Sequence, residues 1–348
     1  MDAGFRPLPQ AEPCQNGRRG AGGHNAASAR IAVERDRVVN QDLKSTEPLR
    51  EPRAAPITAG DDFTRGGFAR LAHFQSPMWS HYREELESTS RVFGSLAWGD
   101  GPGGYPWPLD PLHWWSRIWE YPFFAAHLAN LAQPGARPRL LDIGAAVTFF
   151  TLYMRAQGLE VLSMDADPAM AAHFARVYHR VAPALGLSAT VPPYLIAEAR
   201  ETELPGESFD VLTCVSVLEH IPGWELALQE MKRLLRVGGH LVLTFDVNLT
   251  PESNGFTLDE VGRLLDCLAQ DMEPLTAQDR EIPDDVLHMT NSPCVTHLPR
   301  VRRSILKGVW PPTALPGKIS RRLRRLRHPP APATVKNLCV YGGVWRKR

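Results

Sequence analysis

From Arg139 onwards, apolar runs of strand length alternate with amphipathic runs of helix length. The candidate strands read RLLDIG, EVLSMDAD, TVPPYLIAEA, FDVLTCVSV and HLVLTFDV, and NLCVYGGVWRK near the C-terminus reads as a last strand or a hairpin. Regular alternation of this kind brings parallel strands together and places helices on both faces of the sheet. It predicts an α/β fold with a doubly wound, mostly parallel sheet.

Several of the intervening helices carry recognisable end signals. Asp167 is an expected N-cap, followed by Pro168 at the first helical position. Thr257 and Glu260 have the spacing of a capping box. The Val-Gly-Gly sequence at 237–239 is expected to end the helix that precedes it.

Composition divides the chain into five parts. Residues 1–60 are rich in Pro, Gly, Ala and Arg and are expected to be a disordered tail. Residues 61–135 are expected to form a helical, aromatic-rich cap, residues 136–275 the core, residues 276–334 a basic, Pro-rich insertion, and residues 335–348 the final strand of the core. The cap holds six of the nine tryptophans: Trp79, Trp98, Trp107, Trp114, Trp115 and Trp119. These side chains either pack on the core or form a lid over a substrate pocket.

Charge is divided unevenly along the chain. The formal net charge is +1, but residues 286–348 contain fourteen Lys and Arg residues and no acidic one. Within this stretch, apolar residues of KISRRLRRLRH recur at helical spacing among arginines. The segment 318–328 therefore either contacts an anionic surface as an amphipathic helix, or is a helix that is solvated or packs on the acidic remainder.

Other features point to a cytoplasmic location. No apolar run approaches the length of a membrane span, and the N-terminus lacks the apolar region of a secretory signal. The five cysteines are far apart in the sequence and include no C-x-x-C pair. This spacing argues against a disulfide framework or a zinc ribbon and favours a reducing compartment.

In a doubly wound sheet, ligands bind at the carboxyl ends of the strands. The first strand ends at Gly144, and the second ends at Asp165, 21 positions later. The carboxylate of an acidic residue at this spacing is placed to accept hydrogen bonds from two ribose hydroxyls. The G-x-G-x-x-G pattern of dinucleotide sites is incomplete, because its second glycine position holds Ala146, and there is no P-loop. The turn therefore favours a nucleoside ligand without phosphates.

Four segments together resemble the class I S-adenosylmethionine-dependent methyltransferases in order and spacing, over about residues 139–250. They are LLDIGAAVTFF, MDAD, LPGESFDVLTCVSVLEHIP and MKRLLRVGGHLVLTFDV. The resemblance implies a Rossmann-like, seven-stranded sheet with an antiparallel last strand. It also implies S-adenosyl-L-methionine as cofactor and methyltransferase activity.

The resemblance also assigns cofactor-binding roles at the ends of four strands. These are Asp142 and Gly144 at the methionine end, Ala145 and Ala146 along the turn, Asp165 at the ribose hydroxyls, Ala166, Glu198 and Ala199 at the adenine, and Val215 and Ser216 near the sulfonium. Arg117 is a possible partner for the cofactor carboxylate, and Asp142 has the alternative of only capping its turn.

An alcohol or amine acceptor must lose a proton, so a base is expected nearby. His220 is the first catalytic candidate, Asp246 the second and His113 the third. Glu219 and His220 also fit the plain start of a helix. Asp246 and Asn248 are too few oxygen ligands to predict a metal site.

The acceptor is expected to be a small or lipid-like molecule that is methylated on oxygen or nitrogen. The aromatic cap favours such an acceptor, and Ser-Val-Leu-Glu-His-Ile-Pro at 216–222 stands where the exocyclic-amino base methylases of this fold carry N/D-P-P-Y. A nucleic-acid acceptor is therefore not expected. The alternative function is a non-catalytic nucleotide-fold binding protein whose basic C-terminal segment binds a membrane surface or nucleic acid.

Overall fold

The computed structural model describes residues 61–97, 111–131, 137–251, 253–276, 278–294 and 337–348. All of them belong to one compact unit, Lys44–Arg348. The predicted tail (1–60), the segment 318–328, and Trp98 and Trp107 lie outside the described residues.

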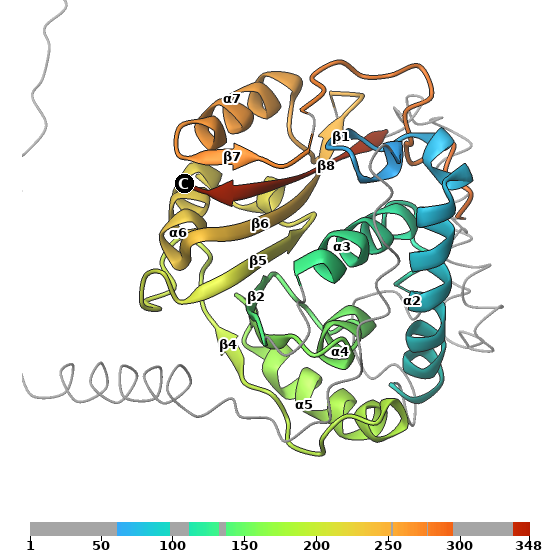
Figure 1. Ribbon diagram of the computed structural model, residues 1–348, viewed down its shortest axis with the longest axis vertical. Helices are drawn as coiled ribbons and strands as arrows, with labels where there is room; N and C mark the ends of the chain where they lie inside the picture. Colours follow the sequence, from blue (N-terminus) through green and yellow to red (C-terminus); the bar gives the residue numbers. More distant parts are fainter. Residues whose placement is uncertain (1–60, 98–110, 132–136, 252, 277, 295–336) are drawn as a thin grey trace, which may run out of the picture. The chain divides into compact units, whose positions relative to one another are not determined.

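A mixed sheet forms the centre of the described chain (Figure 1). Its parallel strands are β2 (Arg139–Ile143), β3 (Glu160–Asp165), β4 (Tyr194–Ile196), β5 (Phe209–Val215) and β6 (Leu235–Asn248). The strand order is β1-β8-β6-β5-β2-β3-β4, and β7 also pairs with β8. The predicted doubly wound, mostly parallel sheet is confirmed.

The C-terminal strand β8 (Leu338–Lys347) is antiparallel to β6, as predicted. On its other side, β8 pairs with two short antiparallel strands, β7 (Met272–Pro274) and β1 (Gly67–Phe68). The sheet therefore has eight strands rather than the seven expected, because the N-terminal region contributes β1.

Helices cover both faces of the sheet (Figure 1). One side carries α2 (Pro77–Leu96), α3 (Arg117–Leu131), α4 (Phe149–Ala156) and α5 (Ala169–Val181), and α2 contacts the other three. The other side carries α6 (Trp224–Leu234) and α7 (Leu258–Ala269). Short 3-10 helices are η1 (Asp62–Thr64), η2 (Leu71–Gln75), η3 (Ala182–Leu185) and η4 (Leu218–His220).

The expected helix ends are partly correct. Thr257 and Glu260 form the predicted capping box at the start of α7. Asp167 accepts a hydrogen bond from the Ala169 N–H at 2.9 Å, and α5 begins at Ala169, one residue later than predicted. The predicted stop at 237–239 is wrong. The helix α6 ends at Leu234, and both glycines lie inside β6, where its pairing with β5 is irregular.

The described aromatic residues of the cap pack inward. Trp119 is fully buried, stacks on Phe123 with ring centroids 4.8 Å apart, and donates from Nε1 to His73 Nδ1 at 2.9 Å. Trp115 is also buried, and Trp79 and Trp114 pack against the same core. In the described part of the cap, the tryptophans therefore serve packing rather than forming a lid.

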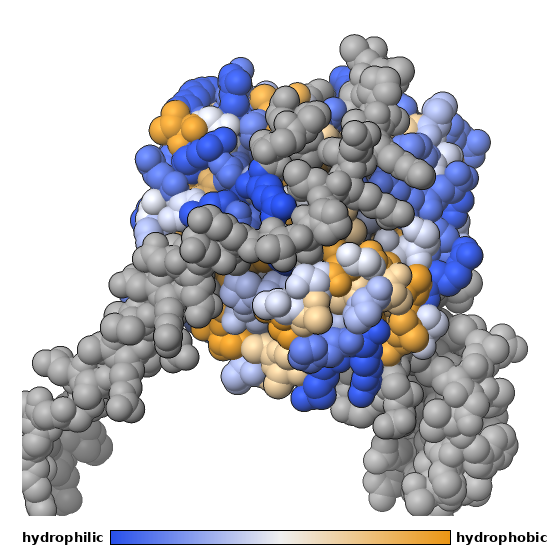
Figure 2. Space-filling view, turned by 60° about the horizontal axis from the view of Figure 1, so that its bottom comes forward, coloured by the Kyte–Doolittle hydropathy of each residue, from blue (hydrophilic) through white to orange (hydrophobic). Residues whose placement is uncertain are grey.

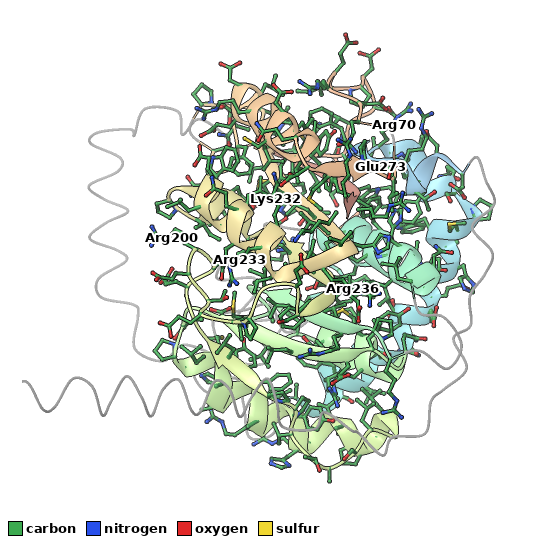
Figure 3. The ribbon with its side chains drawn as sticks, turned by 60° about the vertical axis from the view of Figure 1, so that its left-hand side comes forward. Arg70, Arg200, Lys232, Arg233, Arg236 and Glu273 are labelled. Carbon is green, nitrogen blue, oxygen red and sulfur yellow. The ribbon has the colours of Figure 1, made fainter. Side chains whose placement is uncertain are left out.

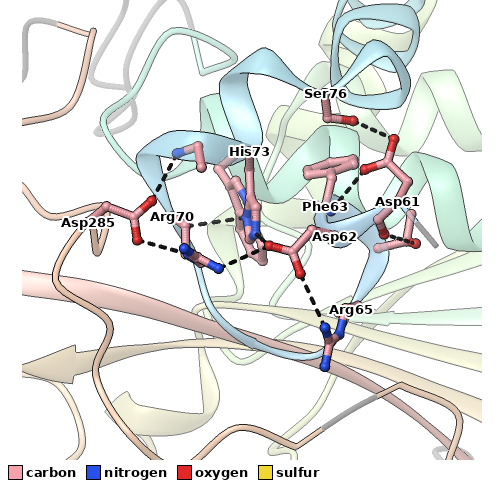
Figure 4. Close-up of polar contacts among 11 residues, drawn as sticks. Asp61, Asp62, Phe63, Arg65, Arg70, His73, Ser76 and Asp285 are labelled. Atoms are coloured by element: carbon pink, nitrogen blue, oxygen red, sulfur yellow. Dashed lines mark hydrogen bonds and ion pairs between the residues drawn. The ribbon is translucent and has the colours of Figure 1, made fainter.

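An ionic network joins the cap to residues 278–294, part of the predicted insertion (Figure 4). Arg70 donates to Asp285 Oδ1 at 2.8 Å and to Asp62 Oδ2 at 3.1 Å. The buried His73 lies with its Nε2 3.5 Å from the same Asp62 oxygen. Backbone pairing between Arg70 and Val286 continues this contact. Residues 278–294 therefore pack against the N-terminal region.

Most large apolar side chains of the described chain are buried. Figure 2 shows apolar residues interspersed with hydrophilic ones on the face it presents. The large apolar side chains that remain exposed are Leu96, Leu226, Val237, Leu258 and Leu275. None of the helices in the described ranges combines the length and the apolar character that crossing a bilayer requires.

Candidate functional site

The order of the strands brings the predicted cofactor residues to one edge of the sheet. The parallel strands β5, β2, β3 and β4 are consecutive neighbours. Their carboxyl ends therefore lie at the same edge, where doubly wound sheets bind ligands. The predicted residues follow these four ends.

The turn after β2 has the backbone conformation that a glycine-rich turn requires. Gly144 has a φ of 69° and Ala146 a φ of 45°, both in the left-handed region. A Cβ on Gly144 would lie 2.4 Å from Val217 Cγ2, so only glycine fits there. Ala146 occupies a position typical of glycine at a cost of about 1–2 kcal/mol. The turn thus keeps the shape of the motif although a glycine is missing.

Asp165 joins this turn to the end of β3. Its carboxylate accepts hydrogen bonds from the Ala146 N–H at 3.2 Å and from the Asp167 N–H at 2.9 Å. Asp165 is only half-buried, and each carboxylate oxygen can accept a further hydrogen bond. The acid and the tight turn therefore form one site, and this arrangement fits an adenosyl ligand held through its ribose hydroxyls.

The Asp142 side chain lies beneath this edge, between β2, β5 and α4. It is buried and accepts hydrogen bonds from Thr213 Oγ1 at 2.8 Å and from Thr151 Oγ1 at 3.3 Å. Burial raises the pKa of Asp142 to about 6, although the two hydroxyls oppose the shift. The hydroxyl contacts hold the strand end that leads into the turn.

The remaining predicted cofactor residues differ in exposure. Ala145 and Ala199 are buried, Val215 is half-buried, and Ala166 and Glu198 are exposed. The Glu198 carboxylate lies 3.8 Å from the Arg200 guanidinium, which Figure 3 labels. All five follow or end strands of the same sheet edge.

A buried polar cluster lies beside this edge, below α3. Glu120 is fully buried, and its Oε1 accepts hydrogen bonds from Ser216 Oγ and Thr244 Oγ1, each at 2.6 Å. Its Oε2 forms an ion pair with Arg117. The Ser216 hydroxyl, predicted to lie near the sulfonium, therefore points to Glu120. The Arg117 guanidinium, a possible partner for the cofactor carboxylate, is paired with Glu120.

Two further carboxyl groups complete the cluster. Glu219 Oε1 accepts a hydrogen bond from the Asp246 N–H at 2.9 Å. Among the described residues, Glu219 Oε2 and Asp246 Oδ1 are buried and have no hydrogen-bond partner. Burial, with the nearby charge of Glu120, raises the pKa of Asp246 to about 7. Burial and the charge of Asp246 raise the pKa of Glu219 well above its usual range.

The other two candidate bases differ in position. His220 is exposed at the end of η4, next to Glu219 in the chain. Partial burial and the positive charge of Arg117 lower its pKa, so it is neutral at pH 7. His113 Nε2 lies 3.2 Å from Glu87 Oε2 on α2. The structure thus brings Asp246 into the cluster, keeps His220 close to it, and pairs His113 with α2.

Glu120, Glu219 and Thr244 lie in this cluster but are not among the residues predicted for the site. Glu120 had a usable signal, since an acid within the otherwise apolar WEYPFFAAHL must find a partner if that helix is buried. Within the described ranges, no three His, Cys, Asp or Glu side chains are arranged to hold a metal ion.

A family model described as a methyltransferase domain matches residues 141–243. The chain is 31% identical over 193 residues to a ubiquinone biosynthesis O-methyltransferase of Xanthomonas campestris pv. campestris, covering 54% of this chain and 70% of that protein. It is 27% identical over 233 residues to a tRNA U34 carboxymethyltransferase of Hydrogenovibrio crunogenus, covering 66% of each. A solved structure of Haemonchus contortus phosphoethanolamine N-methyltransferase 2 aligns with a TM-score of 0.39, at 17% identity, over 63% of this chain and 51% of that one.

The matched residues 141–243 include the turn after β2, Asp165 and the end of β5. The Xanthomonas relative is matched over more than two thirds of its length. The chain therefore belongs to the class I S-adenosylmethionine-dependent methyltransferases, and its reaction is the transfer of the methyl group of S-adenosyl-L-methionine.

Proposed function

We propose that the chain methylates an O or N atom of a small-molecule or lipid-like acceptor, which binds at the ends of β5 and β6 beside the buried polar cluster. The observation that carries this proposal is the unpartnered, buried Oδ1 of Asp246 at the end of β6. When bound, S-adenosyl-L-methionine supplies a reactive methyl group. The protein then has to align the acceptor, exclude water and accept a proton.

The cofactor would be held along the adjacent strand ends. Asp165 would accept the ribose hydroxyls, since its carboxylate is already fixed against the turn by two backbone N–H groups. The other proposed contacts are Asp142, Gly144, Ala145 and Ala146 at the methionine end, Ala166, Glu198 and Ala199 at the adenine, and Val215 and Ser216 near the reacting methyl. Ser216 would contribute there through its backbone, because its hydroxyl is used by Glu120.

Asp246 is the proposed general base. A base works best when its pKa lies near the working pH, and burial brings the pKa of Asp246 to about 7. Its unpartnered oxygen is available to take the proton of an acceptor O–H or N–H. His220, neutral and next to Glu219, is the second candidate. We expect kcat/KM to rise with pH to a plateau above about pH 7.

The acceptor class rests on two supports. The relative named as a ubiquinone biosynthesis O-methyltransferase favours a small-molecule oxygen. The buried cluster offers polar contacts, whereas the described tryptophans of the cap pack in the core and no longer argue for an apolar lid. The relative named as a tRNA carboxymethyltransferase makes RNA the comparison to include in the test.

Two further proposals concern the setting of the enzyme. Cys214, Cys267, Cys294 and Cys339 are free thiols, which agrees with a reducing, cytoplasmic compartment. Contact of the segment 318–328 with an anionic surface is proposed from its sequence alone.

Isothermal titration with S-adenosylhomocysteine tests the cofactor site. The substitution Asp165→Asn removes the charge but can still accept hydrogen bonds, and hydrogen bonds to charged groups contribute about 1.5–3 kcal/mol. We therefore expect affinity to fall by roughly 10- to 100-fold. Asp167→Ala is the matched control, because this carboxylate caps α5 instead. Equal affinity of Asp165→Asn and the wild type would show that the ribose site is misplaced.

The acceptor is found by incubating the protein with labelled S-adenosyl-L-methionine and a fractionated extract. Label in the small-molecule or lipid fraction is expected. Label confined to RNA would refute the proposed acceptor class while leaving methyl transfer intact. Asp246→Asn serves as the variant expected to lose transfer but keep cofactor binding.

A further inference from the structure

The buried cluster contains more acidic groups than its described cation can balance. Arg117 pairs with Glu120, whose oxygens also accept from Ser216 and Thr244. Both oxygens of Glu120 therefore have donors. Arg117 also acts on Asp246, so one guanidinium faces the three acidic groups Glu120, Glu219 and Asp246.

The groups that face this pair come from several elements. On α3 they are Arg117 and Glu120, Ser216 follows β5, and on η4 His220 follows Glu219 directly. The buried thiols of Cys214 on β5 and Cys339 on β8 lie close enough to feel the charges of Glu219 and Asp246. Among these described neighbours, Arg117 is the permanent cation.

Each of the two carboxyl groups has one oxygen without a hydrogen-bond donor among the described residues. Glu219 Oε1 is held by the Asp246 backbone, so the Glu219 side chain is fixed in place. The free oxygens, Glu219 Oε2 and Asp246 Oδ1, are both buried. Buried carboxylates are retained in proteins when they are paired with a positive charge or with hydrogen-bond donors. Among the described residues, no hydrogen-bond donor reaches these two oxygens, and the charge of Arg117 is shared between Asp246 and Glu120.

We propose that Glu219 and Asp246 bind the ammonium group of a cationic amine, which the methyl acceptor carries. An ammonium has three N–H donors and a positive charge, so it can satisfy both free oxygens and balance the pair. This inference rests on the proposed function, because it places the acceptor at the end of β6 and gives Asp246 one proton of the ammonium, which frees the lone pair of the amine nitrogen for the methyl group. It adds a selection rule, namely that cationic acceptors are preferred over neutral ones of the same shape.

The same charge balance makes binding of the ammonium sensitive to pH. Without a bound cation, burial keeps a proton on Glu219 and, up to about pH 7, on Asp246. A bound ammonium favours the ionised forms, so its binding releases protons and strengthens as pH rises towards 8.

The test uses the full chain saturated with S-adenosylhomocysteine, with methylammonium chloride as the probe. Methylammonium is compared at 100 mM with sodium chloride at the same concentration and with methanol, its neutral counterpart. A ligand that binds only the folded state raises the midpoint of thermal unfolding, and we expect a shift of roughly 2 °C or more at pH 8. The shift should be lost in Glu219→Gln and in Asp246→Asn, which preserve side-chain size.

The exposed Glu281 supplies the matched control, since Glu281→Gln removes one carboxylate remote from the cluster in sequence. It should keep the full shift. Equal midpoints in methylammonium and sodium chloride for the wild type would overturn the inference, as would a shift that survives in both cluster variants. Titration with S-adenosylhomocysteine distinguishes a failure of the ammonium site from a failure of the proposed methyltransferase function. Normal cofactor affinity without a methylammonium effect refutes the ammonium site and leaves methyl transfer standing.

Discussion

Ala146 shows how one side chain can limit a binding turn. It adopts a φ of 45°, where an L-residue is strained by about 1–2 kcal/mol and glycine is not. Glycine also makes the unfolded chain more flexible, and this cost of about 0.5–1 kcal/mol offsets part of the stabilisation gained by removing the strain. We predict that Ala146→Gly stabilises the protein by up to about 1 kcal/mol in urea unfolding and tightens binding of S-adenosylhomocysteine.

Ala145→Gly is the control for that change. Ala145 precedes it in the same turn, is buried, and does not have a left-handed φ. Glycine there relieves no strain, so it should destabilise the protein by about 0.5–1 kcal/mol. Destabilisation by both glycine variants would contradict the strain assigned to Ala146.

Asp246 should make the stability of the protein depend on pH. Its pKa is raised from 3.8 to about 7, chiefly by burial, so the folded state binds a proton that the unfolded state has already released. The contribution of this proton to the free energy of unfolding is complete below about pH 4 and is lost as the pH rises through about 7. Asp246→Asn removes this loss and should be more stable than the wild type at pH 8.5, by up to about 4 kcal/mol. Urea unfolding of both proteins at pH 5 and pH 8.5 measures the difference. A difference in stability that is the same at both pH values would contradict the raised pKa.

At the scale of single residues, the sequence predicts candidates whose position depends on the local pattern. Gly144 follows β2, Asp165 ends β3, and Asp246 lies two residues before the end of β6, and strand ends are visible in the apolar pattern. Glu120 was not predicted as a site residue, because its partners Ser216 and Thr244 lie 96 and 124 residues away in the sequence. Such long-range pairings leave no periodic trace in one sequence.

The contact between α3 and the sheet depends on a glycine in β8. A Cβ on Gly342 would lie 2.9 Å from Trp119 Cη2 and 3.1 Å from Thr244 Cγ2. Trp119 is buried and also stacks on Phe123, so it has little room to move. We predict that Gly342→Ala destabilises the protein by about 1–3 kcal/mol in urea unfolding, by forcing α3 away from the strand.

Replacement of Gly262 in α7 by alanine is expected to have the opposite effect on stability. A Cβ there would meet nothing within 4 Å, and alanine favours a helix over glycine. Gly262→Ala should therefore stabilise the protein by about 0.5–1 kcal/mol. If the two variants changed stability in the same direction, the close approach of α3 to β8 would not be the controlling contact.

At the scale of elements, long amphipathic segments were predictable and short strands were not. The helix α7 and the strand β5 carry enough residues for a clear apolar period. By contrast, β1 has two residues and β7 three, and both exist only because β8 offers them a partner. The early end of α6 was missed for a related reason, since tertiary pairing of Leu235 with Phe209 overrides the later glycine signal.

At the scale of the whole molecule, charge is the property that the fold leaves unbalanced. Several cations of the described chain are paired with carboxylates, among them three residues that Figure 3 labels. Lys232 lies 2.5 Å from Asp271, Arg233 lies 2.7 Å from Glu230, and Arg236 lies 2.6 Å from Asp210. Residues 1–285 nevertheless hold 38 acidic residues against 25 basic ones. The excess of basic residues is concentrated after Asp285, so an anionic partner would be attracted there.

This asymmetry leads to a prediction for the segment 318–328. If its arginines contact an anionic surface, the full chain should sediment with vesicles containing phosphatidylserine and be released by salt, because screening weakens attraction between exposed charges. Deleting 318–328 should abolish sedimentation while affinity for S-adenosylhomocysteine stays unchanged, since the proposed cofactor residues lie between Asp142 and Ser216. Neutral phosphatidylcholine vesicles are the control and should bind neither protein. Loss of cofactor affinity in the deletion variant would instead mean that the segment supports the catalytic core, and unchanged sedimentation would mean that the basic charge acts elsewhere.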